Sequence, residues 1–191
     1  MTQPLIDQLY FQAHGLDVTE PEALEEAVRL AVQRLPVGLY TESARSLTED
    51  EIKLLRAGGL SPAAESGPDP LTETTVAFAA LLQTSLTTAQ AAERLGVHIS
   101  RVRQLLAGPL YGFQLEGHWR IPRFQFGDRG LVANIDQVNA ALNRSLHPVA
   151  IYRWYTTPDP DLETETGPVS PLAWLAAGYD PTAVRTLAAD L

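Results

Sequence analysis

Apolar residues recur at helical spacing near the start of the chain. A capping-box sequence at residues 19–22 (TEPE) precedes apolar positions that follow the i, i+3, i+4, i+7 pattern from Leu24 to Leu35. A second capping box, TEDE at residues 48–51, opens another short apolar stretch. Both patterns predict amphipathic helices, because the box satisfies free amides in the first turn and the spacing gathers apolar side chains on one face.

Turn-forming residues separate these helices from the centre of the chain. Gly58 and Gly59 are expected to end the second helix, and residues 61–70 (SPAAESGPDP) have the composition of a linker. A further helix is expected at about residues 72–84. We interpret residues 1–70 as a helical scaffold or a surface for dimerisation.

Residues 87–126 combine two short amphipathic helices with the pattern of a β-hairpin. Thr87 and Gln90 form a capping box at the first helix, which Gly96 is expected to end in a left-handed conformation. Ser100 is expected to cap the second helix. A helix, a turn, a second helix and a hairpin in this order are typical of a winged helix-turn-helix. The apolar face of the second helix consists of Ile99, Val102, Leu105 and Leu106.

The hairpin is predicted from apolar and polar residues that alternate on either side of Glu116 and Gly117, which suit a tight turn. Pro122 cannot donate a ladder hydrogen bond, so the second strand is expected to finish there. In this arrangement Trp119 and Ile121 are buried, and the basic side chains face outward as a wing.

The polar face of the second helix and the wing carry groups suited to DNA. A guanidinium group fits guanine O6 and N7, and a glutamine amide fits adenine N6 and N7. The alternative interpretation is that the helix pair only packs and that its arginines are solvated. The residues expected to contact DNA are Thr88, Gln90, Ser100, Arg101, Arg103, Gln104, His118, Arg120 and Arg123.

The charge of the chain is distributed unevenly. The 191 residues carry a net charge of −9, which argues against a general nucleic-acid binder. Residues 1–86 and 130–191 carry −8 and −4, whereas residues 87–129, which hold the predicted winged helix-turn-helix, carry +3. Because about three or four phosphate contacts give weak binding and about 6–10 give tight binding, we expect a homodimer on a two-fold site in double-stranded operator DNA.

The tail has marked helix start signals. A helix is expected near residues 136–146, followed by an aromatic segment at 151–155 and an acidic stretch that runs to Gly167. We interpret the acidic stretch as a solvated loop rather than a calcium site. Ser170 and Asp180 are each followed by Pro, which predicts the N-caps of two further short helices.

The sequence lacks the features of several other classes of protein. There is no Cys, which excludes disulfides and thiolate zinc sites, and the four His residues have no metal-ligand spacing. No nucleotide-binding or nucleophile-elbow motif occurs, so we expect no enzymatic activity, no cofactor and no metal. We also expect no signal peptide and no membrane span, and hence a cytoplasmic protein.

Several segments resemble a known group of proteins. LTTAQAAERLGV and RVRQLL resemble the excisionase/MerR-type winged helix domain, and GHWRIPRFQF resembles the wing of members fused to a toxin-binding tail. LHPVAIYRWYTTPDPDL and GPVSPLAWLAAGYDPTAVRTLAADL resemble the toxin-binding domain of antitoxins that neutralise RES-domain toxins. The resemblance covers about residues 47–191. Many such antitoxins differ in carrying an Xre-like DNA-binding domain.

The resemblance implies an antitoxin that covers its toxin's active site with its C-terminal helices and represses its own operon. Since RES toxins consume NAD, that chemistry would belong to the partner. Large aromatic residues in a small domain are otherwise explained as core, whereas an exposed one is typical of an interface anchor. The residues that the resemblance assigns to partner binding are Trp154, Ser170, Pro171, Leu172, Trp174, Gly178 and Val184.

We therefore predict a mainly α protein with a central winged helix-turn-helix and a small β-hairpin, flanked by helical N- and C-terminal regions. The expected divisions are residues 1–70, 71–130 and 131–191. The leading hypothesis for function is an antitoxin that also acts as a repressor of its own transcription. The alternatives are a stand-alone DNA-binding regulator or excisionase-like protein whose tail only dimerises, and a protein-interaction module that does not bind DNA.

Overall fold

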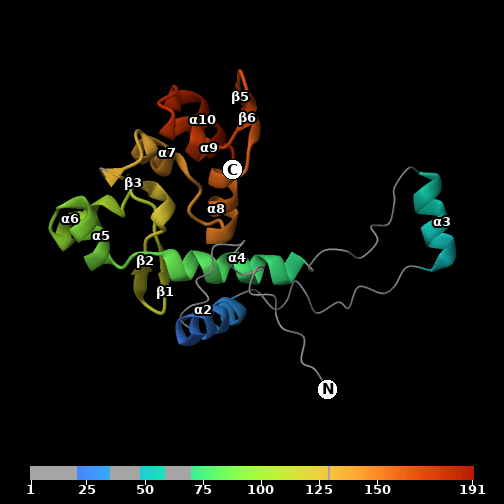
Figure 1. Cartoon of the computed structure of the whole chain (residues 1–191), viewed down its shortest axis with the longest axis horizontal. Helices are drawn as coiled ribbons and strands as arrows, with labels where there is room; N and C mark the ends of the chain where they lie inside the picture. The colour runs from blue at the N-terminus through green and yellow to red at the C-terminus, as the bar shows by residue number, and fades with distance from the viewer. Residues whose placement is uncertain (1–20, 35–47, 59–69, 129) are drawn as a thin grey trace.

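The protein is described by a computed structural model that covers residues 21–34, 48–58, 70–128 and 130–191. These residues form a mainly helical fold with small antiparallel hairpins, as predicted (Figure 1). The helices are α2 (Pro21–Arg34), α3 (Glu49–Ala57), α4 (Pro70–Thr84), α5 (Thr88–Leu95), α6 (Ile99–Leu105), the 3-10 helix η2 (Arg123–Gln125), α7 (Ile135–Ala141), α8 (Pro148–Thr156), α9 (Pro171–Ala176) and α10 (Pro181–Ala189). The strands are β1 (Phe113–Leu115), β2 (His118–Arg120), β3 (Phe126–Gly127), β4 (Gly130–Leu131), β5 (Asp159–Thr164) and β6 (Gly167–Val169).

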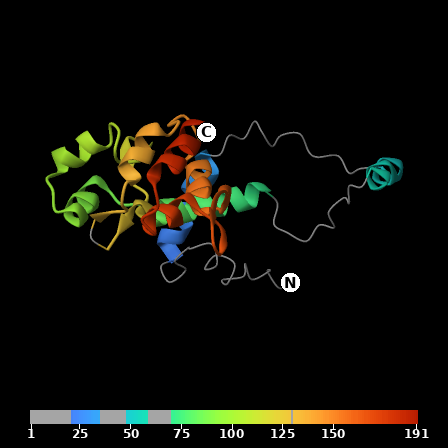
Figure 2. The same ribbon diagram turned by 90° about the horizontal axis from the view of Figure 1, so that it is seen from above.

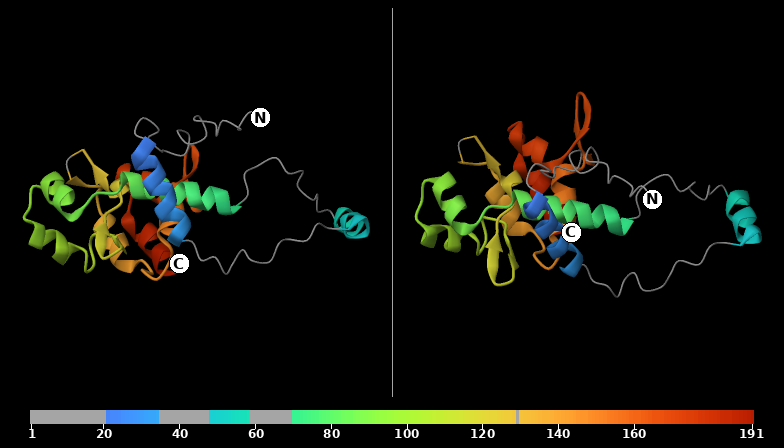
Figure 3. Two further views of the ribbon diagram at one scale, coloured as in Figure 1. Left: turned by 90° about the horizontal axis from the view of Figure 1, so that it is seen from below. Right: turned by 60° about the horizontal axis from the view of Figure 1, so that its bottom comes forward.

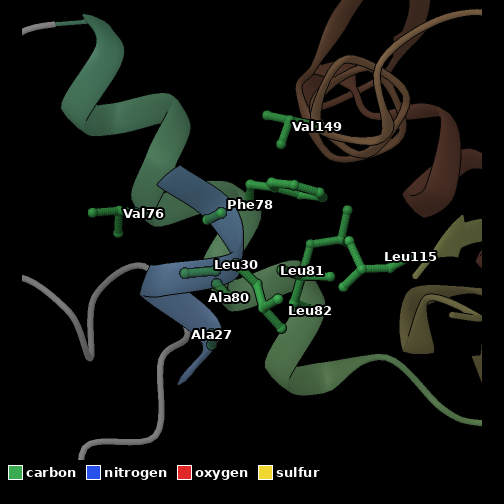
Figure 4. Close-up of a cluster of buried hydrophobic side chains, with 11 residues drawn as sticks. Ala27, Leu30, Val76, Phe78, Ala80, Leu81, Leu82, Leu115 and Val149 are labelled. Carbon is green, nitrogen blue, oxygen red and sulfur yellow. The ribbon is translucent and has the colours of Figure 1, made fainter. Parts of the chain in front are cut away.

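Helix α4 lies at the centre of one cluster of buried side chains (Figure 4). Its residues 78–82 are all buried, and a helix segment that is apolar on every side needs partners on more than one face. Figure 3 shows α2 lying across α4, and Leu30 of α2 and Val149 of α8 both join the cluster. The helices predicted after Leu24 and at 72–84 are confirmed.

Helix α3 stands apart from the other helices (Figures 1 and 2). The capping box predicted for it is present, because Thr48 N donates to Glu51 Oε2 at 2.9 Å and Glu51 N donates to Thr48 Oγ1 at 3.4 Å. Leu54 of this helix is 75% exposed. The start of the first predicted capping box and the predicted linker up to residue 69 lie outside the described residues.

Helices α5 and α6 form the predicted helix-turn-helix at one end of the molecule (Figure 1). Gln90 N donates to Thr87 Oγ1 at 3.2 Å and Thr87 N donates to Gln90 Oε1 at 2.9 Å, so the capping box is confirmed. Gly96 ends α5 with φ 64°, as expected. The start of α6 differs from the prediction: its N-cap is His98, whose Nδ1 accepts from Ser100 N at 3.3 Å. An imidazole nitrogen thus takes the place expected for the Ser100 hydroxyl.

The β1–β2 hairpin follows α6 as predicted. Glu116 and Gly117 turn the chain with φ 52° and 80°, the left-handed values that a tight two-residue turn requires. Ile121 is fully buried, and its amide and carbonyl bond to Leu86 at 2.9 and 2.8 Å, which ties the hairpin to the start of α5. Trp119, expected to be buried, is only half-buried because it lines an open pocket next to Phe113.

Helices α7 to α10 enclose a further cluster of buried side chains that includes Ile151, Leu162 and Val184. The N-caps predicted at Ser170 and Asp180 are confirmed: Ala173 N donates to the first at 3.2 Å and Thr182 N to the second at 3.0 Å. Helix α7 is shorter than the predicted 136–146, and the aromatic segment forms α8, with His147 at its N-cap.

The prediction of a loop for the acidic stretch is wrong, because this stretch forms the β5–β6 hairpin. Thr164 and Gly167 are paired at its turn, and Leu162 is buried while Asp161 and Glu163 are exposed. Leu162 packs β5 against the tail's core, so the side chains on the other face of the strand lie in solvent and can be charged.

Buried polar side chains join the helix-turn-helix region to the tail. Gln125 and Asn139 are both fully buried, and Asn139 Nδ2 donates to Gln125 Oε1 at 2.9 Å. Gln125 also bonds the backbone of Tyr111 in both directions at 2.8 Å. Asn139 Oδ1 accepts from Tyr155 Oη at 2.8 Å. The network crosses the predicted boundary at residue 130, and the three-part division itself stays a prediction.

No helix among the described residues has the length and apolarity that a membrane crossing requires.

Candidate nucleic-acid interface

The exposed face of α6 carries the polar residues predicted to bind DNA. Val102 and Leu106 are buried on the opposite face, at 0% and 3% exposure, and they fix the rotation of the helix about its axis. Arg101 Nη1 donates to Gln104 Oε1 at 3.2 Å, so one arginine and the glutamine lie side by side. The residues brought together on this exposed face are Ser100, Arg101, Arg103 and Gln104.

Apolar side chains flank this polar face at the start of α6. Ile99, expected on the apolar side, is 36% exposed, and Val97 in the preceding turn is 37% exposed. Ile99 is the first residue of α6 and does not join the buried cluster that holds Val102. The interface therefore mixes polar groups with apolar ones.

Not every arginine of the positive segment is available to a ligand. Arg94 Nη2 donates to the carbonyl of Gly127 at 3.0 Å, and its guanidinium lies 5.8 Å from the centre of the Phe126 ring. These contacts hold the β3–β4 hairpin, which was not predicted, against α5. Arg101 and Arg103 form no ion pair with any described residue, so both keep their charge for a partner.

Arg120 was predicted to face outward from a wing, and this prediction is wrong. It is half-buried and lines a pocket of about 270 Å³ together with Glu26 and Leu30 of α2 and Leu82 of α4. Its Nε is buried without a hydrogen bond. The reason is tertiary: α2 packs beside the hairpin on the side where the alternation of the strand places Arg120.

The other predicted DNA contacts lie outside α6. His118 is exposed on β2, and Arg123 is exposed on η2 rather than on the hairpin. Thr88 is half-buried at the first position of α5. Gln90 is exposed, and its Oε1 is committed to the capping box, which leaves its amide nitrogen as the free group.

The tail presents an aromatic pair at its surface. The rings of Trp174 and Tyr179 lie 4.5 Å apart, and Trp174 Nε1 donates to the carbonyl of Asp180 at 2.8 Å. Tyr179 is 45% exposed, and sequence analysis missed it although it lies inside the GYDP segment. The backbone amide of Thr182 and, to a smaller extent, its side chain donate hydrogen bonds to the Asp180 carboxylate and lower its pKa. The start of α10 therefore carries a negative charge at neutral pH.

Two residues assigned to the partner surface are part of the tail's own core. Pro171 is buried and Val184 has 0% exposure, because both side chains pack inside the tail. Neither side chain can therefore touch a partner. Trp154 and Leu172 are half-buried against the same core. Ser170 serves as an N-cap, and Gly178 is exposed with φ 82° in the turn before Tyr179.

Among the residues that the structure describes, no group of three or more His, Cys, Asp or Glu side chains is placed to hold a metal ion.

Comparison with known proteins gives little further information. No family model matches the chain, and no curated protein matches it. Among solved structures, the NMR structure of Rv2175c matches with a TM-score of 0.42 and 25% sequence identity, over 55% of this chain and 80% of that one. A TM-score at this level does not establish a shared fold.

Proposed function

We propose that the chain is a DNA-binding protein that inserts α6 into the major groove. The observation that carries this proposal is the α6 face of Ser100, Arg101, Arg103 and Gln104, which is exposed while Val102 and Leu106 on the opposite face are buried. These side chains can contact both phosphates and base edges. The exposed Ile99 adds an apolar group that can meet a thymine methyl.

The charges that remain exposed limit the strength of binding. Arg94 is bonded to Gly127 and Arg120 lies against α2, which leaves Arg101, Arg103 and Arg123 among the described residues of the positive segment. Three phosphate contacts per protomer are too few for tight binding at physiological salt. A homodimer on a two-fold operator doubles this number, and we propose that form as the active one.

Salt titration tests this proposal. Fluorescence anisotropy of a labelled duplex from the DNA upstream of the chain's own gene would be measured between about 50 and 200 mM salt. We expect the logarithm of the binding constant to fall against that of the salt concentration with a slope of about −3 per protomer and about −5 for a dimer. Absence of binding, or a slope near zero, would contradict DNA recognition. Tight binding by a monomer to one half-site would contradict the dimer alone.

We further propose that the tail binds a RES-type toxin, which makes the chain a cytoplasmic antitoxin and autorepressor. The tail's resemblance to toxin-binding domains supports this proposal. The exposed Tyr179, whose ring packs against that of Trp174 at the surface, also supports it. Aromatic side chains held rigidly at a surface are typical anchors of protein interfaces. The β5–β6 hairpin beside α9 adds exposed carboxylates, among them Glu163 and Glu165.

Co-expression with the RES-type protein of a neighbouring gene tests the antitoxin activity. We expect the chain to rescue growth, and Tyr179→Ala to weaken binding to the purified toxin at least about tenfold, because an interface anchor is lost. Gln137→Ala, on the exposed side of α7 and outside the segments that resemble toxin-binding domains, is the control and should bind normally. Failure to rescue, with DNA binding intact, would favour a stand-alone regulator whose tail only dimerises.

A further inference from the structure

A pocket of about 490 Å³ lies where α2, α4, the β1–β2 hairpin and the segment before α8 meet. We call it the junction pocket. It is separate from the α6 face and from the Trp174–Tyr179 pair. Its volume is within the range of small-molecule sites, which span about 300–1,000 Å³.

One side of the junction pocket is an aromatic wall. The rings of Phe78 and Phe113 lie 6.0 Å apart, and the ring of His147 meets Phe78 edge-on at 4.9 Å. Tyr111 and Trp119 extend this wall. Flat aromatic surfaces of this kind favour a ligand with a ring of its own, which can stack or meet them edge to face.

The charged residues that line the junction pocket are Arg34 and Arg144, and no described carboxylate lines it. In a chain of net charge −9, this concentration of positive charge is a local exception. Neither arginine forms an ion pair with a described residue. Within the described part of the chain, no carboxylate therefore compensates the charge in the pocket, which suits an anion.

Arg144 keeps donors free for such a ligand. Its guanidinium donates to the carbonyls of Leu106 at 2.7 Å, Leu110 at 3.3 Å and Gly108. A guanidinium has five N–H donors, so these three bonds leave two. His147 adds a neutral donor: its Nδ1 accepts from Val149 N, which puts its proton on Nε2, and burial lowers its pKa.

We propose that the junction pocket binds a small aromatic anion, with its ring against the aromatic wall and its acidic group against Arg34 and Arg144. Such a ligand would touch the arginine that holds the carbonyls at the end of α6. This inference does not depend on the proposed DNA or toxin binding.

A matched pair of fluorescent probes tests the inference on the full chain. 8-Anilinonaphthalene-1-sulfonate carries an acidic group, and N-phenyl-1-naphthylamine is the same ring system without it. We expect saturable binding of one sulfonate probe per chain, at least about tenfold tighter than the neutral probe. Equal affinity for the two probes, or no binding of either, would overturn the proposal.

Two further measurements place the probe. Arg34→Gln should weaken the sulfonate probe about tenfold and leave the neutral probe unchanged, whereas Arg153→Gln on the exposed face of α8 should change neither. The chain has three Trp residues, so the indole N–H signals distinguish sites by NMR, with Trp119→Phe to assign one of them. Only the Trp119 signal should shift. An unaltered affinity in Arg34→Gln, or shifts at Trp154 or Trp174 instead, would refute the assignment.

Discussion

Replacing Asn139 by Leu is expected to lower the free energy of unfolding by about 3 kcal/mol. The fully buried amide donates to Pro109 O at 3.0 Å and to Gln125 Oε1 at 2.9 Å, and it accepts from Tyr155 Oη. Leu has the same branched shape and number of heavy side-chain atoms, but it leaves the Pro109 carbonyl and the Tyr155 hydroxyl without their partner, and each buried polar group left unpaired costs about 1–3 kcal/mol. Burial raises the pKa of Tyr155, so its hydroxyl stays neutral and cannot relieve the loss by ionising.

Urea unfolding followed by circular dichroism measures this change. Gln137→Leu is the matched control on the exposed side of the same helix, and it should alter stability by less than about 0.5 kcal/mol. Tyr155→Phe combined with Asn139→Leu should cost less than the sum of the two single changes, because it removes both ends of one hydrogen bond. If Asn139→Leu behaved like the control, the network would not contribute to stability.

Replacing Arg103 by Ala is expected to weaken sequence-specific DNA binding by about 1–3 kcal/mol, or roughly 5- to 150-fold. The side chain is exposed on α6 and makes no hydrogen bond or ion pair with any described residue, so the variant should fold normally. Its loss therefore reports on a ligand rather than on the fold. A guanidinium that bonds guanine in two places carries both affinity and preference for that base pair.

Anisotropy titration with a specific and a scrambled duplex separates these roles. Arg103→Ala should weaken the specific duplex far more than the scrambled one. Arg153→Ala removes the same charge from the exposed face of α8 and serves as the control, with affinity within about twofold of the unaltered chain. An equal and small loss on both duplexes would limit Arg103 to phosphate contact. No loss on either would remove α6 from the interface.

The parts of the fold that sequence predicted are those decided locally. The capping box of Thr87 and Gln90, the left-handed Gly96 and the Pro-led helix starts after Ser170 and Asp180 each depend on a few neighbouring residues. The polar face of α6 followed from helical periodicity alone. These features need no knowledge of what packs against them.

The parts that sequence did not predict depend on distant residues. Arg120 has the alternation of an outward strand residue, but the hairpin pairs it with Phe113 and its side chain lies against α2 and α4. Gln125 and Asn139 are polar residue types, and nothing near them in sequence marks them as fully buried. The β5–β6 hairpin was not predicted because its apolar residues are few: Leu162 is buried and Val169 is half-buried against the same core.

The amide network has a consequence for how such chains diversify. Because Asn139 of the tail shares its bonds with Gln125 and Pro109, the tail cannot be exchanged as a self-contained cassette. A chimaera cut between β4 and α7 would leave a buried amide facing foreign backbone. We therefore expect that a recombination event that preserves folding carries residues 109–125 along with the tail.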